Sequence, residues 1–397
     1  MFAILQSILV YGIMVWVMTY NANRVLKRQF IPKDFRDFIT DKNVLIPLMV
    51  FSFFAAIRWD VGVDCRSYVY MFYNGADEKA LSMGETLFYG MQEFFKSIHF
   101  GHVPFFFTIA LIQIGFIYYG LRKRPEILLF FPLMFVLCGT YWSYMNGVRQ
   151  SVACSIFIFA TLLLSEKKYL WAAAWMLVAT LFHRSAYILL ILGALAYLTR
   201  NYFINRNIQL ILVAICYSMM GMSIGQGLGD FAVDMLGFAG YEKGAQEHML
   251  ETVFEIEFGF RAYLLLFANL IVIYFSNKIR NFYNSVHFNI MYNLYFIGVC
   301  IWLMFYGNHG MERVSMYLTC FIPIILAYAG YFFYYNRRKT LYKVSFYLII
   351  ALLSLRTFYD MYESSNSAFD VVNYKTVIFN DTFNKKYNNK LRYIGQY

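Results

Sequence analysis

An imidazole beside a guanidinium is the first arrangement in this sequence that could do chemistry. His183-Arg184-Ser185 stands between two apolar stretches. Ionisable groups at membrane depth are costly and normally face a cavity, a partner or a pathway. The charge of Arg184 favours a neutral His183, as a general base requires. The alternative is that His183 is a hydrogen-bonded packing residue.

A second polar group, Asn146-Gly147-Val148-Arg149-Gln150, opens an apolar run that continues to residue 164. Asn146 is suited to cap a helix that begins here. Unpaired N–H groups at a helix start, next to Arg149, would suit a phosphate. Alternatively, Arg149 only extends along the helix to reach the membrane interface.

A third group places two cations and two carboxylates between Arg58 and Arg66. The carboxylates are Asp60 and Asp64, and Gly62 between them predicts a tight turn or a close approach of the backbone to a ligand. A solvated loop with internal ion pairs would have the same composition. The aromatic residue Tyr68 follows directly.

Three further polar positions complete the candidates. Glu312 and Arg313 open another apolar run, with Tyr317 one turn further on, and Arg261 opens the run before it. Glu85 begins an amphipathic segment that extends to residue 95 and is expected to lie along the membrane surface. The alternatives are that Glu312 and Arg313 neutralise each other and that Glu85 is solvated.

The elements that position these residues are membrane helices. The 397 residues are 60% hydrophobic, 21% aromatic and only 14% charged, which is too apolar for a soluble protein. Apolar runs near the length needed to cross a bilayer recur throughout. We predict an all-α polytopic protein whose roughly twelve spans lie at about residues 3–20, 44–57, 103–121, 126–143, 149–165, 169–183, 185–199, 208–224, 260–276, 288–306, 311–334 and 341–356. The pair at 169–199 is also compatible with a broken or re-entrant segment.

The distribution of Lys and Arg predicts the orientation. The first run lacks a positive leader and a cleavage site, so it is expected to be a retained helix. The segment 24–42 is rich in Lys and Arg, and alternate connections after it are also basic. Under the positive-inside rule these connections are cytoplasmic, and both termini lie outside. Every candidate group named above then lies at the outer side, and the net charge of +11 reflects topology rather than nucleic-acid binding.

Cysteine spacing offers no metal site and no disulfide framework. Five of the six cysteines fall within apolar runs, and only Cys65 lies in an outer loop. CxxC and HExxH spacings do not occur. We therefore expect no metal and no cofactor.

These motifs together resemble the EpsG family of membrane proteins from bacterial exopolysaccharide and O-antigen loci, which are similar in role to Wzy-type polymerases. The resemblance rests on Arg58 with Gly62-Val63-Asp64 and Tyr68, on Glu85, on Asn146 to Gln150, on the His183 motif, and on Glu312-Arg313 with Tyr317. Val63 and Cys65 depart from the pattern, where Thr and an aromatic residue are expected.

The resemblance implies a glycosyltransferase of GT-C-like architecture with its active site on the outer face of the bacterial cytoplasmic membrane. It would join oligosaccharide repeat units carried on undecaprenyl pyrophosphate, by inverting displacement. Arg149 and Arg313, then Arg58 and Arg184, are expected to hold the pyrophosphate. His183 is the first candidate base, with Asp64 and Glu85 as rivals. The expected substrate contacts are Asn146, Gln150, Asp60, Tyr68, Glu312, Tyr317 and Arg261.

Several alternatives and boundaries remain open at this level. A lipid-linked oligosaccharide flippase would have a similar composition, but it should carry ionisable residues at the bilayer midplane and show related halves. A membrane O-acyltransferase would need cytoplasmic access for its acyl donor. Partners of the same pathway, a chain-length regulator and a flippase, are also implied. We expect one membrane domain over 1–356 with outer loops at 58–102 and 225–259, the second a candidate lid, and a polar outer tail over 357–397.

Aromatic residues are abundant near the outer ends of the predicted spans. Stacking on sugar rings and an ordinary interfacial aromatic belt are both compatible with them, and the belt is the simpler interpretation. The residues concerned are Tyr68, Tyr70, Tyr141, Trp142, Tyr144 and Tyr306.

Overall fold

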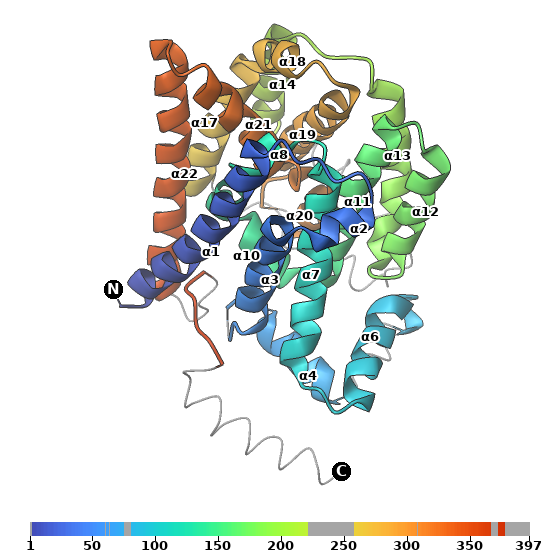
Figure 1. The fold of residues 1–397 in the computed structure, drawn as a ribbon. Helices are drawn as coiled ribbons and strands as arrows, with labels where there is room; N and C mark the ends of the chain where they lie inside the picture. Colours follow the sequence, from blue (N-terminus) through green and yellow to red (C-terminus); the bar gives the residue numbers. More distant parts are fainter. Residues whose placement is uncertain are drawn as a thin grey trace.

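The computed structural model of this protein is a helical bundle (Figure 1). It describes residues 2–59, 61–62, 64–74, 81–220, 258–307, 309–366 and 372–377. The helices in these ranges are α1 (Phe2–Lys27), α2 (Phe35–Thr40), α3 (Lys42–Ala56), α4 (Cys65–Asn74), α6 (Thr86–Ser97), α7 (His102–Leu121), α8 (Pro125–Leu128), α9 (Phe131–Leu137), α10 (Thr140–Asn146), α11 (Val148–Ser165), α12 (Tyr169–Thr180), α13 (Ile188–Thr199), α14 (Arg206–Ser218), α17 (Phe260–Tyr274), α18 (Ser276–Tyr283), α19 (Val286–Met304), α20 (His309–Thr319), α21 (Ile322–Tyr335) and α22 (Thr340–Asn366), with a 3₁₀ helix, η1, at Arg184–Tyr187.

The prediction of a multi-pass, all-helical membrane protein is confirmed, and the described residues form fewer full-length spans than the roughly twelve predicted. Six helices in the described part of the chain are long and apolar enough to cross a membrane. A seventh span results if α17 and α18, which are bent by 59° relative to each other, count as one. Four shorter apolar helices, among them α3 and α14, accompany them.

One predicted span, at 126–143, is interrupted twice in the structure. It forms α8, α9 and α10 instead of a continuous helix. Pro125 and Pro132 stand in the first turns of α8 and α9, where a missing N–H is tolerated, and Gly139 has a left-handed φ of +78° before α10. These three residues explain why an apolar run of adequate length does not form a single helix.

The pair predicted at 169–199 is also short. α12 and α13 have 12 residues each, which gives each about 18 Å at 1.5 Å per residue, less than the ~30 Å of a bilayer core. They meet at η1, which carries the predicted His183 motif at its start. The motif therefore lies in a turn that packs against α11 as well as against α12 and α13.

Helix α11 is the centre of the bundle. It packs against α7, α12 and α19, and 89% of its residues are buried inside the protein. In contrast, α1 and α22 lie at one edge of the bundle (Figure 1), and only 28% and 22% of the residues in their most apolar stretches are buried. The polar residues at the start of α11 are thus held by the most completely packed helix, while α1 and α22 expose apolar side chains as lipid-facing helices do.

Part of the segment predicted as a polar tail packs against the bundle. α22 continues to Asn366, and residues 372–377 return to the bundle. Tyr374 donates from its backbone N–H to Ser7 Oγ at 2.7 Å and from its hydroxyl to Phe54 O at 2.8 Å. The N–H of Trp59 donates to Lys375 O at 2.8 Å. This segment, which we call the strap, joins α1, the end of α3 and the loop that follows it.

Two further predictions fall partly or wholly outside the described residues. The candidate lid at 225–259 is described only at its last two residues, and Asp60 and the side chain of Glu312 are not described. The amphipathic segment after Glu85 does form a helix, α6, which lies beside α4 at the lower edge of Figure 1. It buries Phe88 and Gln92 on one face.

Candidate active site

Glu85 connects three of the predicted site residues. It stands at the N-cap of α6 and is only 1% exposed. Its Oε2 accepts from Arg149 Nη1 at 2.5 Å, and its Oε1 lies 2.7 Å from His183 Nδ1 and accepts from the backbone N–H of Arg184 at 3.1 Å. Burial alone would raise the pKa of Glu85, but the hydrogen bond and charge of His183, the charge of Arg149 and the Arg184 N–H together lower it. Glu85 is therefore an ionised group shared by a base candidate and a cation.

Backbone contacts hold this arrangement in place. The N–H of Leu87, in the first turn of α6, donates to Leu181 O at 3.0 Å. Gly84, just before Glu85, has a φ of +82°, which favours glycine. His183 is in an extended conformation at the start of η1. A backbone hydrogen bond thus joins the start of α6 directly to the end of α12, close to the carboxylate of Glu85.

The contact with Glu85 determines which nitrogen of His183 is available. A carboxylate can only accept, so Nδ1 carries the hydrogen, and Nε2 of the neutral ring keeps its lone pair. His183 lines a pocket of about 730 Å³, and Glu85 does not line it. His183 can therefore meet a ligand in this pocket directly, while Glu85 contacts His183 from outside the pocket.

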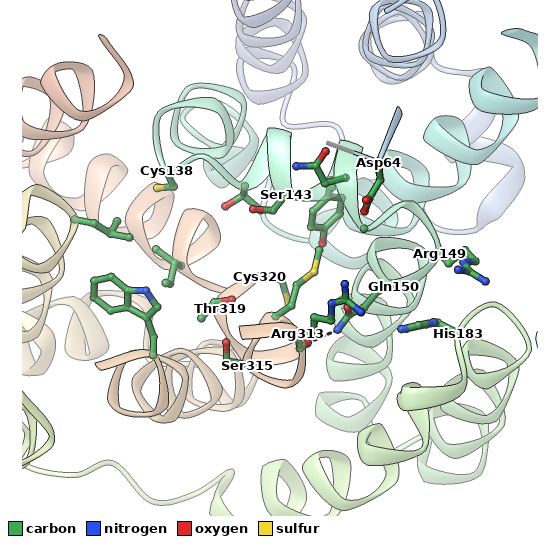
Figure 2. A pocket seen from close by; sticks show the side chains of 18 of the residues that line it. Asp64, Cys138, Ser143, Arg149, Gln150, His183, Arg313, Ser315, Thr319 and Cys320 are labelled. Carbon is green, nitrogen blue, oxygen red and sulfur yellow. Dashed lines mark hydrogen bonds between the residues drawn. The ribbon is translucent and has the colours of Figure 1, made fainter. Parts of the chain in front are cut away.

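Arg149 lies on the other side of Glu85 and lines the same pocket (Figure 2). Its guanidinium carbon is 5.5 Å from the centre of the Phe88 ring and 6.0 Å from that of Tyr68. Its Nε is buried and has no hydrogen-bond partner within the described part of the chain. Because only one of its nitrogens is used by Glu85, Arg149 retains donors for an anion.

The contact between α11 and α20 brings Arg313 to the pocket that Arg149 lines. Gln150 Nε2 donates to the backbone carbonyl of Arg313, which fixes the start of α20 against that of α11 (Figure 2). The side chain of Arg313 is exposed to the pocket, and no ion pair of it is found among the described residues. Two guanidinium groups from different helices therefore face one cavity.

Asp64 is a carboxylate in the pocket lining itself. Burial raises its pKa, and the nearby charges of Arg313 and Arg149 partly oppose that rise. Its loop makes the tight approach that the sequence predicts at Gly62. Gly62 has a φ of +92°, and a Cβ there would collide with Oδ1 of Asn146. Asp64 can therefore reach the pocket only because residue 62 is glycine.

Asn146 has a different role from the predicted helix cap. It is the last residue of α10, and Gly147 takes the cap position of α11 without a side-chain hydrogen bond. Asn146 also lines the pocket, and its Oδ1 is buried with no hydrogen-bond partner in the described ranges. It is thus available to a ligand.

Arg58 does not enter the pocket. It is 5% exposed, and it donates to Ala55 O at 2.5 Å and to Met145 O at 2.9 Å. It thereby ties the end of α3 to the end of α10, next to Asn146. The prediction that Arg58 contacts a pyrophosphate has no support in this geometry, because both of its hydrogen-bonding partners are backbone carbonyls within the bundle.

The remaining predicted residues also divide into those that line the pocket and those that lie outside it. Tyr68 and Arg261 line the pocket, while Arg184 and Tyr317 do not. The Tyr317 hydroxyl lies 2.8 Å from Ser185 Oγ and is buried, so it fastens η1 to α20. Arg184 contributes its backbone N–H to Glu85.

Most of the aromatic residues predicted near the outer ends of the spans do not form an interfacial aromatic belt. Tyr141, Trp142 and Tyr144 are buried, and the first two pack against Tyr11. Tyr144 and Tyr306 line the pocket, while Tyr70 is exposed. The belt interpretation is therefore wrong for α10, whose aromatic side chains face the interior of the bundle.

Arg356 and Asp360 are site residues that the sequence analysis did not identify. Arg356 lines the pocket, and Asp360 is in ion-pair contact with it and with Arg261. A signal was present, because Arg356 and Asp360 are an (i, i+4) pair within an otherwise apolar helix. The predicted span ends at Arg356, and this arginine has no predicted role.

Comparison with known proteins gives one match. A model of the EpsG family matches residues 43–376, which include every pocket residue discussed above. No curated protein and no solved structure matches the chain. No cluster of metal-binding side chains is found in the described part of the chain. The protein is therefore a multi-pass membrane protein that belongs to the EpsG family, a family linked to exopolysaccharide biosynthesis.

Proposed function

We propose that this protein is a polysaccharide polymerase that transfers an oligosaccharide from undecaprenyl pyrophosphate to the non-reducing end of a second lipid-linked repeat unit. One observation carries the proposal. The guanidinium groups of Arg149 and Arg313 line a single pocket. His183 lines it as well, and the buried carboxylate of Glu85 holds the Nδ1 of this histidine. Polymerisation needs a diphosphate-binding cation pair and a base, and this pocket offers both.

Arg149 and Arg313 are assigned to the diphosphate of the donor. Guanidinium groups bind phosphate oxygens through paired N–H donors and keep their charge at any working pH. As the bond between the anomeric carbon and the diphosphate breaks, negative charge grows on the leaving oxygen. Cations positioned in advance lower the barrier to that step. Arginine thus performs here what a metal ion performs in other glycosyltransferases.

His183 is assigned as the base. The hydroxyl of the acceptor sugar attacks the anomeric carbon while its proton moves to His183 Nε2. The carbon–oxygen bond to the diphosphate breaks on the opposite face, so the configuration inverts. Glu85 holds the ring and stabilises the imidazolium that results. Asp64, in the same pocket, orients the hydroxyl or the sugar and is the second candidate for the base.

The remaining assignments complete the proposal. Asn146, Gln150, Tyr68 and Arg261 contact the substrate or the groups that hold it. The pocket faces the outer side of a bacterial cytoplasmic membrane, both termini lie on that side, and the bundle is of the GT-C type. A flippase and a chain-length regulator of the same pathway act with this protein in making an O-antigen, a capsule or another exopolysaccharide.

A reconstituted reaction tests this function. Purified protein in lipid nanodiscs is incubated with a lipid-linked repeat unit, and products are resolved by size. We expect a ladder from the wild type, and none from Arg149→Ala or His183→Ala. Arg337→Gln, which changes an exposed cation at the opposite side of the bundle, should leave the ladder intact. If proteoliposomes move the substrate across the bilayer without lengthening it, the protein is a carrier. If surface sugars gain acyl groups instead, it is an acyltransferase.

A further inference from the structure

The pocket contains a second pair of guanidinium groups away from Glu85. Arg261 lies in the first turn of α17 and Arg356 in the second half of α22, two helices that pack side by side. Both meet the carboxylate of Asp360. Arg356 also donates to Leu137 O at 3.3 Å, next to Cys138. In Figure 2, Cys138 lies at one end of the pocket, and Arg149 and His183 lie at the other.

The turn between α9 and α10 accommodates Arg356 closely. Gly139 has a φ of +78°, and a Cβ on it would lie 2.8 Å from Nη1 of Arg356. The hydroxyl of Thr357 donates to the same carbonyl, Leu137 O, at 3.1 Å. The guanidinium is therefore held in one position by the backbone of this turn.

The guanidiniums at this end make only long contacts with their shared carboxylate. Asp360 lies 3.8 Å from Arg261 and 3.6 Å from Arg356, and the charge of Glu363 also acts on Arg261. Both distances exceed the 2.7–2.9 Å that is usual for strong charge-assisted hydrogen bonds. Each guanidinium has five N–H donors, so most of them remain available. Arg261 is also 53% exposed. The two guanidiniums therefore keep open hydrogen-bonding capacity toward a ligand in the pocket.

The surroundings of the cluster suit a lipid-linked ligand. Trp302 and Tyr306 line the pocket with their ring centres 5.7 Å apart, and aromatic faces of this kind stack on sugars. On the outside of the bundle, α17 and α22 expose Phe260, Leu355 and Phe358. A head group at Arg261 and Arg356 would place an attached hydrocarbon chain along these two helices, within the bilayer.

We propose that Arg261 and Arg356 form a second diphosphate subsite, which holds the lipid diphosphate of the acceptor. This inference rests on the proposed function, in which both substrates carry a diphosphate. Only the donor loses its own. The new bond joins the acceptor oxygen to the donor's anomeric carbon, the donor's carbon–diphosphate bond breaks, and the acceptor's stays intact. The repeat unit of the acceptor then extends along the pocket from Arg356 toward His183.

Binding of inorganic pyrophosphate tests the subsite without any turnover. Isothermal titration of the purified protein in detergent should show two equivalents bound to the wild type. Arg261→Gln and Arg356→Gln should each bind one, and so should Arg313→Gln. The matched control Arg337→Gln should bind two. Arg261 is half exposed, so its replacement tests the subsite even if Arg356→Gln fails to fold. One equivalent in the wild type, or two in Arg261→Gln, would overturn the inference.

The choice of acceptor identifies the source of the anion. With a labelled donor, Arg261→Gln should raise KM for a lipid-diphosphate acceptor about ten-fold, the loss of one or two charge-assisted hydrogen bonds, and leave kcat near that of the wild type. With the same repeat unit on a neutral alkyl glycoside, the variant and the wild type should not differ. Equal impairment with both acceptors would mean that the arginines bind the sugars or only support the fold, and would reject the subsite. Failure of the wild type to lengthen either acceptor would reject the polymerase instead, while the pyrophosphate titration would still report on the second subsite.

Discussion

Two carboxylates of this protein, at opposite ends of α11, each contact several positively charged groups, but the two clusters have different roles. Glu85 meets Arg149 and His183 near the start of the helix, while Glu166, just past its last residue, meets Lys123, Lys168 and Arg122. In both, burial would raise the pKa of the carboxyl, and the cationic partners lower it. By charge and by pKa the two clusters are alike.

What differs is where the partners face. Lys123 and Lys168 are more than half exposed, and none of the partners of Glu166 lines the pocket. Arg149 and His183 line the pocket, and the carboxylate between them is almost completely buried. A cation at the end of a membrane helix is therefore informative only when its other side faces a cavity. The cluster at Glu166 reflects topology, and the cluster at Glu85 builds a site.

The largest expected effect comes from His183. His183→Gln keeps a hydrogen-bonding side chain but cannot take a proton, so the rate of chain lengthening should fall about 10³-fold, within the range for a lost general base. The matched change at the other cluster, Lys168→Gln, should leave the rate unchanged. A single-turnover assay with a lipid-linked repeat unit measures both. A His183→Gln rate within a few-fold of the wild type would make Asp64 the base.

Replacement of Arg149 by lysine should have the next largest effect. Lysine keeps the charge but loses the paired N–H donors, so the rate should fall by about 10²-fold, similar to the loss of one transition-state donor. Arg122→Lys, next to Glu166, should have no effect on the rate. If Arg149→Lys were as active as the wild type, charge alone would hold the diphosphate and the two clusters would differ less than we propose.

Gly62→Ala should damage both stability and activity. The substitution is strained by the positive φ and collides with Asn146, so we expect a loss of about 1–3 kcal/mol in the free energy of unfolding. Chain lengthening should decrease along with it, because the loop that carries Asp64 is displaced. Thermal unfolding in detergent measures the first effect. Gly12→Ala, where a Cβ has nothing within 4 Å, is the control.

The smallest effect is on the pH dependence of stability. Since the folded pKa of Glu85 is lowered, its stabilisation is complete above the unfolded value of about 4.3 and is lost as the pH falls through the folded value. Glu85→Gln should therefore have a smaller drop in unfolding temperature than the wild type between about pH 5 and pH 3. Glu166→Gln should change this drop less, because water screens the partners of Glu166. Equal changes in the two variants would contradict the distinction between the clusters.

Much of the site can be predicted from the sequence because its residues stand out against apolar surroundings. The ionisable side chains of Arg149, His183 and Arg313 each cost free energy in a membrane, and the glycine at position 62 indicates a close approach of the backbone to another group. What connects them cannot be predicted in this way. Glu85 lies in an amphipathic segment where carboxylates are usually solvated, and only the contact between α6 and the end of α12 makes it the partner of two site residues.

Other residues are misread because tertiary contacts decide their role. Arg58 has the composition of a ligand-binding cation, but its guanidinium is occupied by two backbone carbonyls. Arg356 has no predicted role, but it lies against the turn at Gly139 and lines the pocket. The described residues form fewer full-length spans than predicted for a related reason, since prolines and short helices break apolar runs whose length alone suggests a crossing.

The strap has a practical consequence for mapping topology. Reporter fusions to a series of C-terminal truncations assume that each shortened chain keeps the arrangement of the helices before it. A fusion placed directly after Asn366 removes the carbonyl of Lys375 that receives the Trp59 N–H and the phenol of Tyr374 that reaches Phe54. Such a fusion should report the side of α22 correctly and yet be inactive. Insertion of the reporter into the intact chain avoids this loss.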